Sequence, residues 1–64
     1  MQPHQQRVVD EKTELDDKLT KLMSFIEESP VYAGLPKDEQ NRLRMQAIFM
    51  RGYSDVLAER IAAF

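Results

Sequence analysis

A short segment rich in proline and glycine, residues 29–36, divides the chain into two blocks of strong helix formers. We predict a first helix over about residues 5–28, a loop over 29–36 and a second helix over about 37–63, with Pro36 at the first helical position. Two helices of about 25 residues joined by a short loop form an antiparallel hairpin. The predicted fold class is therefore all-α, with residues 1–64 forming a single helical-hairpin domain.

Apolar residues in both blocks recur at intervals of three and four, the spacing of a coiled-coil seam. The seam of the first helix consists of Val8, Leu15, Leu19, Leu22 and Ile26, with Lys12 at its one polar position. The seam of the second helix consists of Leu43, Ala47, Met50, Ser54, Leu57, Ile61 and Phe64. We expect these two seams to face each other within the hairpin.

The second helix also carries a second stripe at the same spacing, made of Gln46, Phe49, Tyr53, Val56, Arg60 and Ala63. One partner helix cannot cover two stripes, and an exposed row of Phe49, Tyr53 and Val56 is a liability on a monomer. A chain of 64 residues without cysteine also has too small a core to be very stable alone. We therefore expect the hairpins to assemble into a homo-oligomeric helical bundle, with the second stripe between subunits.

The composition argues against several classes of function. There is no cysteine and only one histidine, His4, so we expect neither a metal site nor a cofactor. No apolar run is long enough to span a membrane, and the start lacks the features of a signal peptide, so we expect a cytoplasmic protein. No glycine-rich phosphate loop or nucleophile–histidine pair is present. Binding or assembly is the expected role, and not catalysis.

Three arginines form a local basic patch on a chain whose net charge is −2. Arg42, Arg44 and Arg51 span ten residues that contain no acid. This pattern favours a small anion over a long nucleic-acid track, so no DNA partner is expected. For Arg42 and Arg44 the alternative is a surface salt bridge. For Lys12 two readings stay open: its stem extends along the seam to water, or its ammonium binds a phosphate between subunits.

Two spaced blocks of residues carry a resemblance to a known family. The first block runs from His4 to Lys12 and continues through Glu14-Leu15-Asp16. The second comprises Leu35-Pro36, Glu39-Gln40, Arg42-Leu43-Arg44, Tyr53-Ser54, and Leu57 through Ala63-Phe64. Over residues 4–64 the chain resembles the helical hairpin of phage signal-sponge proteins, which counter the CBASS and Thoeris immune systems. Members of that family capture cyclic nucleotide-type signals without cleaving them.

The resemblance implies a homohexamer that acts in the cytoplasm of an infected host cell. Family members hold cyclic dinucleotides between subunits and cyclic trinucleotides in separate pockets near the threefold axis. Matching the pattern places ligand-binding residues of the family on Lys12 and Arg42. Arg7, Asn41 and Arg44 join them as candidates by proximity and chemistry. Anti-CBASS members carry a base-stacking aromatic upstream of the lysine, and Tyr32 is the candidate substitute here.

A second interpretation fits the same hairpin. Small plasmid copy-number regulators are helical hairpins that dimerise into four-helix bundles and bind RNA. The length and predicted architecture of this chain suit such a structural or RNA-binding dimer equally well, whereas the net charge of −2 argues against it. Light scattering separates the two hypotheses, because a sponge is expected to be a hexamer and a regulator a dimer.

Overall fold

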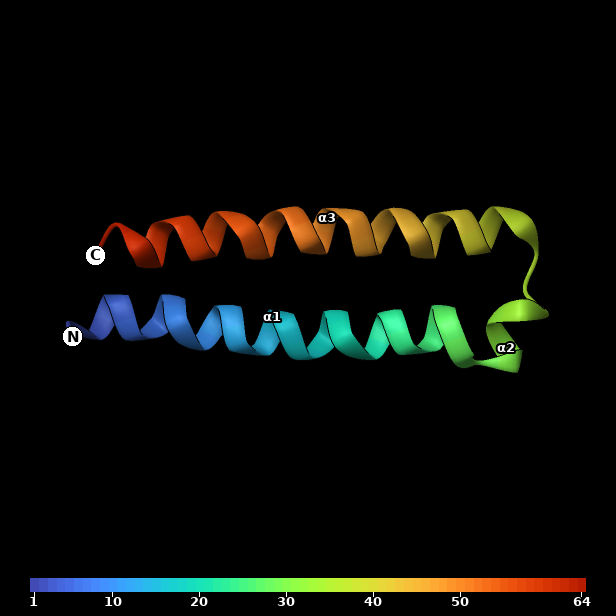
Figure 1. Ribbon diagram of the computed structural model, residues 1–64, viewed down its shortest axis with the longest axis horizontal. Helices are drawn as coiled ribbons and strands as arrows, with labels where there is room; N and C mark the ends of the chain where they lie inside the picture. Colours follow the sequence, from blue (N-terminus) through green and yellow to red (C-terminus); the bar gives the residue numbers. More distant parts are fainter.

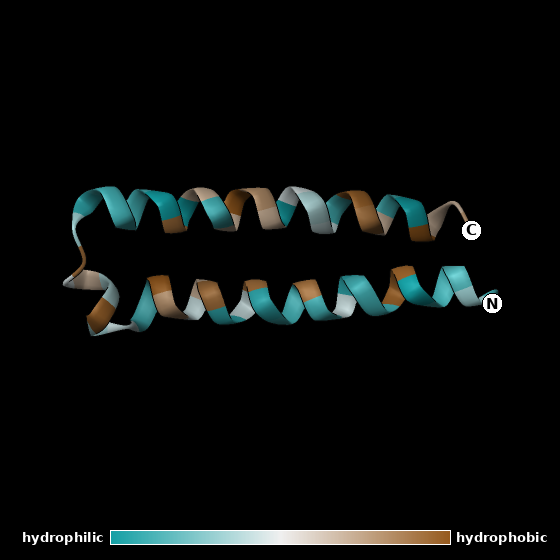
Figure 2. Cartoon of the chain, turned by 180° about the vertical axis from the view of Figure 1, so that it is seen from behind, coloured by the Kyte–Doolittle hydropathy of each residue, from teal (hydrophilic) through white to brown (hydrophobic).

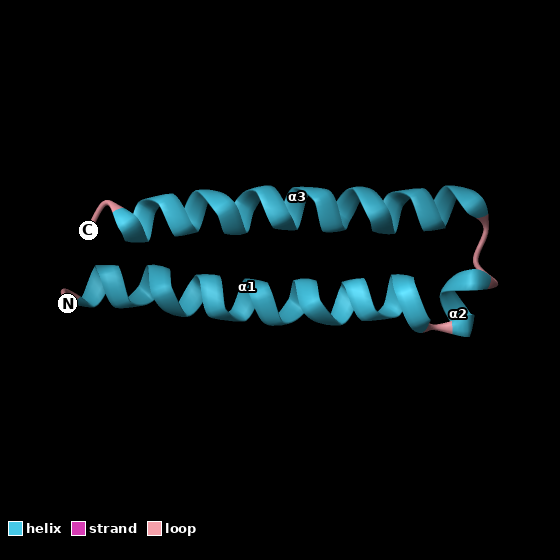
Figure 3. Cartoon of the chain, viewed as in Figure 1, coloured by secondary structure: helices cyan, strands magenta, loops and turns pink.

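The computed structural model covers residues 1–64 and shows two long helices lying side by side, with both chain ends at the same end of the hairpin (Figure 1). The elements are α1 (Pro3–Glu28), α2 (Pro30–Ala33) and α3 (Lys37–Ala62). The rest of the chain is loop or turn, with no strand (Figure 3). The molecule measures 46 × 15 × 13 Å. The prediction of an all-α antiparallel hairpin is confirmed.

Helix α1 begins at Pro3, earlier than the predicted residue 5. Proline suits a helix start because the first N–H groups of a helix have no partner within it. The side chain of Gln5 extends the ordered start by accepting a hydrogen bond from the Gln2 N–H at 2.8 Å. The helix ends at Glu28 because Ser29 precedes Pro30, and a residue before proline is driven out of the helical region. Ser29 accordingly has extended angles, φ −81° and ψ 128°.

The segment predicted as a loop contains one helical turn, α2, which is anchored to both long helices. Its first turn is capped by Ser29, whose Oγ accepts from the Val31 N–H at 3.1 Å. The buried Tyr32 ring meets Phe25 of α1 edge to face, with centroids 6.0 Å apart. From α3, Gln40 Nε2 donates to the Tyr32 carbonyl at 2.9 Å. These contacts set the angle at which the chain reverses.

The prediction that Pro36 occupies the first helical position is wrong by one residue. Pro36 is the N-cap of α3, with φ −56° and ψ 148°, and its carbonyl accepts from the Gln40 N–H at 3.0 Å. An N-cap residue is extended, although its carbonyl already accepts the first helical hydrogen bond. The acidic residues Asp38 and Glu39 follow in the first turn, where the helix dipole favours negative charge.

The two seams face each other. In Figure 2 the brown apolar bands of α1 lie on the side toward α3, whereas those of α3 are not confined to its inner side. Buried residues come from both seams: Val8, Leu15, Leu19, Ala47, Ser54 and Leu57. Leu57 has no exposed surface and forms a cluster with Val8 and Leu15. Phe64 is the exception, being 46% exposed, because α3 ends at Ala62. The seam prediction is otherwise confirmed.

The second stripe stays uncovered on one hairpin. Phe49 is 69% exposed, Val56 52% and Tyr53 46%, whereas the seam of the same helix is closed against α1. Met45 and Ile48 are exposed as well. Neither long helix has an apolar stretch that would let it cross a membrane. The sequence-based expectation that one helical neighbour leaves this stripe open is confirmed, and a partner for it remains a prediction.

Candidate functional site

Lys12 lies in a polar cluster that crosses from α1 to α3 in the middle of the apolar seams. Its Nζ is 2.6 Å from Asp16 Oδ2, one turn along α1, and donates to Ser54 Oγ of α3 at 3.1 Å. Ser54 in turn donates to the other oxygen of the Asp16 carboxylate. The Lys12 side chain keeps 27% of its surface exposed. The ammonium thus has two neighbours inside the hairpin and retains access to solvent, which combines features of both sequence-based readings.

The carboxylate of Asp16 is the electrostatic centre of this cluster. The hydrogen bond from Lys12, followed by the one from Ser54, lowers the pKa of Asp16 below its ordinary value. The positive charges of Lys12 and of nearby Arg51 lower this pKa further, whereas partial desolvation opposes them. Asp16 is therefore a stable anion at neutral pH and offsets one of the two cations beside it.

The remaining candidates on α3 make local contacts near its beginning. Arg42 Nε lies 2.8 Å from Glu39 Oε1, and the arginine side chain is 67% exposed. Arg44 donates from Nη2 to the amide oxygen of Asn41 at 2.7 Å. The first contact is a surface ion pair of the kind expected to add little stability. The second leaves the positive charge of Arg44 without a carboxylate partner.

One hairpin does not bring Lys12 and Arg42 together. Lys12 contacts Ser54, and Arg42 lies twelve residues earlier on α3, about 18 Å along the helix axis. Arg7 is exposed near the end of the hairpin that holds the termini, whereas Asn41 and Arg44 lie toward the α2 end. Tyr32 is buried against Phe25, so its ring is not free to stack on a base. The sequence candidates thus form two separate groups within one chain.

The structure adds Asp16 and Ser54 to the candidate site residues, and it places Arg51 of the basic patch near Asp16. The sequence carries a signal for the contact between Lys12 and Ser54. Each is the one internal polar residue of its seam, and an antiparallel register can pair them. The basic patch marks Arg51 as a charged residue, but nothing in the sequence places it beside Asp16, because its position relative to α1 depends on how the helices are rotated about their axes.

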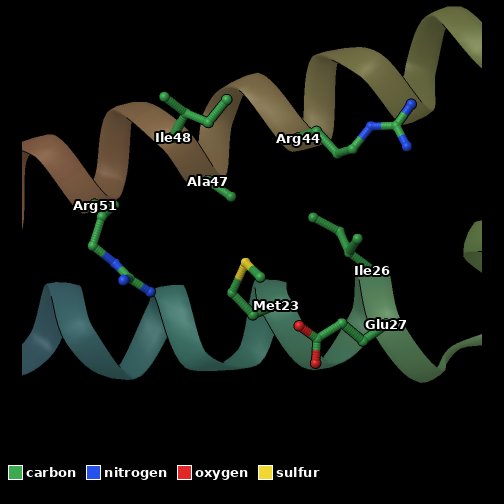
Figure 4. Close-up of a pocket in the computed structure, with 7 residues that line it drawn as sticks. All are labelled: Met23, Ile26, Glu27, Arg44, Ala47, Ile48 and Arg51. Atoms are coloured by element: carbon green, nitrogen blue, oxygen red, sulfur yellow. The ribbon is translucent and has the colours of Figure 1, made fainter.

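Arg51 borders a groove between the two long helices, on the side where α3 presents Arg44. Figure 4 shows Arg51 extending from α3 toward α1, with Met23 and Ile26 rising from α1 into the space between them. The groove has a volume of about 450 Å³ and is completed by Glu27, Arg44, Ala47 and Ile48. A second, more polar hollow of about 440 Å³ shares Met23, Glu27 and Arg51 and includes Asp16, Thr20 and Ser24. No group of histidine or acidic residues suited to hold a metal ion is found.

A comparison with protein families matches nearly the whole hairpin. The family model described as Sequestin matches residues 2–63, which include both long helices and the polar cluster. No curated protein and no solved structure shows a significant match to the chain. The match agrees with the resemblance that residues 4–64 carry to signal sponges.

Proposed function

Because the chain belongs to the Sequestin family, which implies a sequestering role, we propose that it is a phage anti-defence sponge for cyclic oligonucleotide immune signals. In this proposal the protein binds cyclic dinucleotides, cyclic trinucleotides or both without cleaving them, and so blocks CBASS-type signalling in the host cytoplasm. The observation that carries the proposal is the family match over residues 2–63. The small size and the uncompensated arginines of α3 are consistent with a binding role.

A sponge of this kind needs several chains, because one hairpin offers only a shallow surface to a ligand. The exposed second stripe supplies an apolar face that a second copy can cover. The resemblance to signal sponges makes a homohexamer the favoured assembly. Lys12 and Arg42, about 18 Å apart along one hairpin, can then meet only when they come from different subunits. We propose them as phosphate ligands, with Arg7, Asn41 and Arg44 as further candidates.

The ammonium of Lys12 could bind a phosphate because its contacts within the hairpin do not use all of its hydrogen-bond donors. The ammonium has three N–H donors, of which Asp16 and Ser54 occupy two in this structure. A phosphate oxygen can accept from the third. Arg42 offers a fork of donors that matches phosphate geometry, and its surface pair with Glu39 is weak enough to be exchanged.

A depletion experiment tests the proposal. Purified protein at micromolar concentration is mixed with cyclic diadenylate or cyclic triadenylate and removed by filtration, and the free ligand is measured. We expect depletion of at least one ligand, and recovery of intact ligand after the protein is denatured. Recovery of cleaved ligand would show that the protein is an enzyme and not a sponge. If neither ligand is depleted, and their guanylate counterparts are not depleted either, the proposal is refuted.

The site assignment needs separate variants. Lys12→Met keeps an apolar stem of similar length in the seam and removes the ammonium, whereas Arg42→Ala removes an exposed guanidinium. Both variants are expected to keep the helical circular dichroism of the wild type. Each should bind ligand about tenfold or more weakly, because it loses a charge-assisted hydrogen bond to phosphate. Wild-type affinity in both variants would show that Lys12 and Arg42 are not ligands, even if the protein is a sponge.

A further inference from the structure

Ser54 is the one polar residue buried in the hairpin, and it lies on the seam of α3 between two charged residues of α1. Its hydroxyl accepts a hydrogen bond from Lys12 Nζ at 3.1 Å and donates one to Asp16 Oδ1. Asp16 Oδ2 accepts from Lys12 Nζ at 2.6 Å, which closes a ring of three hydrogen bonds. Every side-chain hydrogen bond between α1 and α3 is made by Ser54, so the ring is fixed to both long helices.

The direction of each hydrogen bond in the ring follows from the chemistry of its members. An ammonium can only donate and a carboxylate can only accept, so the hydroxyl of Ser54 must accept from Lys12 and donate to Asp16. Asp16 is an anion at neutral pH, because the hydrogen bonds from Lys12 and Ser54 lower its pKa. The ring therefore has a single arrangement of protons at neutral pH.

The ring fixes the position of the Lys12 ammonium before any ligand arrives. A lysine carries its charge on a flexible four-carbon stem, and a ligand that orders this stem loses affinity to the lost rotamer freedom. Here the freedom is already lost on folding, because atoms from two helices hold Nζ. One of its three N–H donors is unused, and 27% of the side chain is exposed, so an acceptor outside the hairpin can reach that donor.

The charges around the ring balance within one hairpin. The hollow beside it is lined by Arg51 and by the carboxylates of Asp16 and Glu27, and Lys12 supplies the second cation. One hairpin therefore offers a phosphate a directed donor at this point but no net positive charge. The excess positive charge that a phosphate needs has to come from another subunit, in agreement with a ligand site between subunits.

We infer that Asp16 and Ser54 are positioning residues, which hold the Lys12 ammonium so that its unused N–H donates to a phosphate oxygen of a ligand bound between subunits. This inference rests on the proposed function for the ligand and for Lys12 as a phosphate ligand. Ser54 provides the clearest case, because a buried, uncharged hydroxyl influences a phosphate outside the hairpin only through Lys12. Asp16 has two opposed effects: its charge competes with the phosphate, and its hydrogen bond holds the donor in place.

Affinity measurements on the assembled protein separate positioning from charge. Calorimetry with cyclic diadenylate and cyclic triadenylate is carried out on wild type, Ser54→Ala and Asp16→Ala. We expect both variants to bind about fivefold or more weakly, although Asp16→Ala removes a competing negative charge. The matched controls Ser24→Ala and Asp17→Ala remove a hydroxyl and a carboxylate from exposed contacts on α1 and should bind like wild type. Circular dichroism and light scattering establish that each variant is folded and assembled.

A double-mutant cycle shows whether Ser54 acts through Lys12. In Lys12→Met the hydroxyl has no ammonium to hold, so adding Ser54→Ala should not lower the affinity further. An equal loss of affinity from Ser54→Ala in both backgrounds would give Ser54 a purely structural role and overturn the inference. Wild-type affinity in Ser54→Ala, or tighter binding by Asp16→Ala, would overturn it as well. All three results would leave the sponge intact.

NMR relaxation of the lysine Cε atoms supplies a readout that needs no ligand. In the wild type, Cε of Lys12 should be more ordered than Cε of Lys21, whose side chain is 76% exposed, and Ser54→Ala should release it. A Lys12 as mobile as Lys21 in the wild type would overturn the inference, whether or not a cyclic nucleotide binds. If the wild type binds no cyclic nucleotide, the proposed function fails, whereas an ordered Lys12 that Ser54→Ala releases would still support a positioned cation. The same readout decides the case in which Lys12→Met binds too weakly for the cycle.

Discussion

The two faces of α3 differ sharply in how much of their apolar surface one chain buries. On the seam side, Leu57 is fully buried and Ala47 nearly so, whereas on the second stripe Phe49 is 69% and Val56 52% exposed. Only seven of 64 residues are buried, so the core is a single row of contacts between two helices. Folding of the hairpin therefore depends on the seam, and the second stripe is left over for another interaction. Predictions that separate these two faces test both statements.

The largest expected effect is on the seam, at Leu57. Leu57→Ala removes a fully buried side chain that packs with Val8 and Leu15, and such substitutions cost about 2–5 kcal/mol. A core this small has little stability in reserve, so we expect the variant to lose much of its helical circular dichroism at 25 °C and to show a greatly lowered midpoint in urea.

A matched control uses an exposed aliphatic residue. Val31→Ala removes apolar atoms from a residue that is 63% exposed in α2, so the unfolding midpoint should stay close to that of wild type. Equal loss of stability in Val31→Ala and Leu57→Ala would show that burial within one hairpin does not determine its stability.

The second prediction concerns the open face. Phe49→Asp places a charge in the middle of the second stripe and is expected to abolish self-association while the seam keeps the hairpin folded. Light scattering should then report a mass near 7.5 kDa, that of one chain, with helical circular dichroism preserved. Phe49→Leu keeps the face apolar and should retain the wild-type mass. An unchanged mass in Phe49→Asp would place the subunit contact elsewhere on the hairpin.

Periodicity in the sequence predicts those features of the fold that the residues of a single helix determine. The 3–4 spacing identifies the seam and the second stripe, and the proline and glycine segment marks where the chain reverses. It misses the single turn of α2, because that turn is held by tertiary contacts of Tyr32 with Phe25 and Gln40. It also misses the partnership of Asp16 and Arg51 near Lys12, which depends on the axial register and rotation of α1 against α3.

The polar cluster of Lys12, Asp16 and Ser54 makes the contribution of the seam side to folding stability depend on pH. The pKa of Asp16 is lowered in the folded chain, chiefly by the hydrogen bonds from Lys12 and Ser54. Its contribution to stability is therefore fully present above the ordinary value of 3.8 and is lost as the pH falls below it through the folded pKa. Thermal melting between pH 7 and pH 2 should show an acid-induced fall that is smaller in Asp16→Asn. Asp17→Asn, which removes the same charge from a solvated pair, should keep the wild-type fall.

The smallest expected effect is at Gly52, which lies on α3 beside the second stripe and outside the seam. A Cβ added there meets no atom within 4 Å, so alanine fits the hairpin without rearrangement. Glycine within a helix is less favourable than alanine by roughly 0.5–1 kcal/mol, and Gly52→Ala should raise the melting temperature by a few degrees. The measurement is made in the Phe49→Asp background, where assembly should not contribute, and again in the wild-type background. A gain that appears only in the first background would identify Gly52 as a point of close approach between copies, and a loss in both would contradict the open environment of this residue.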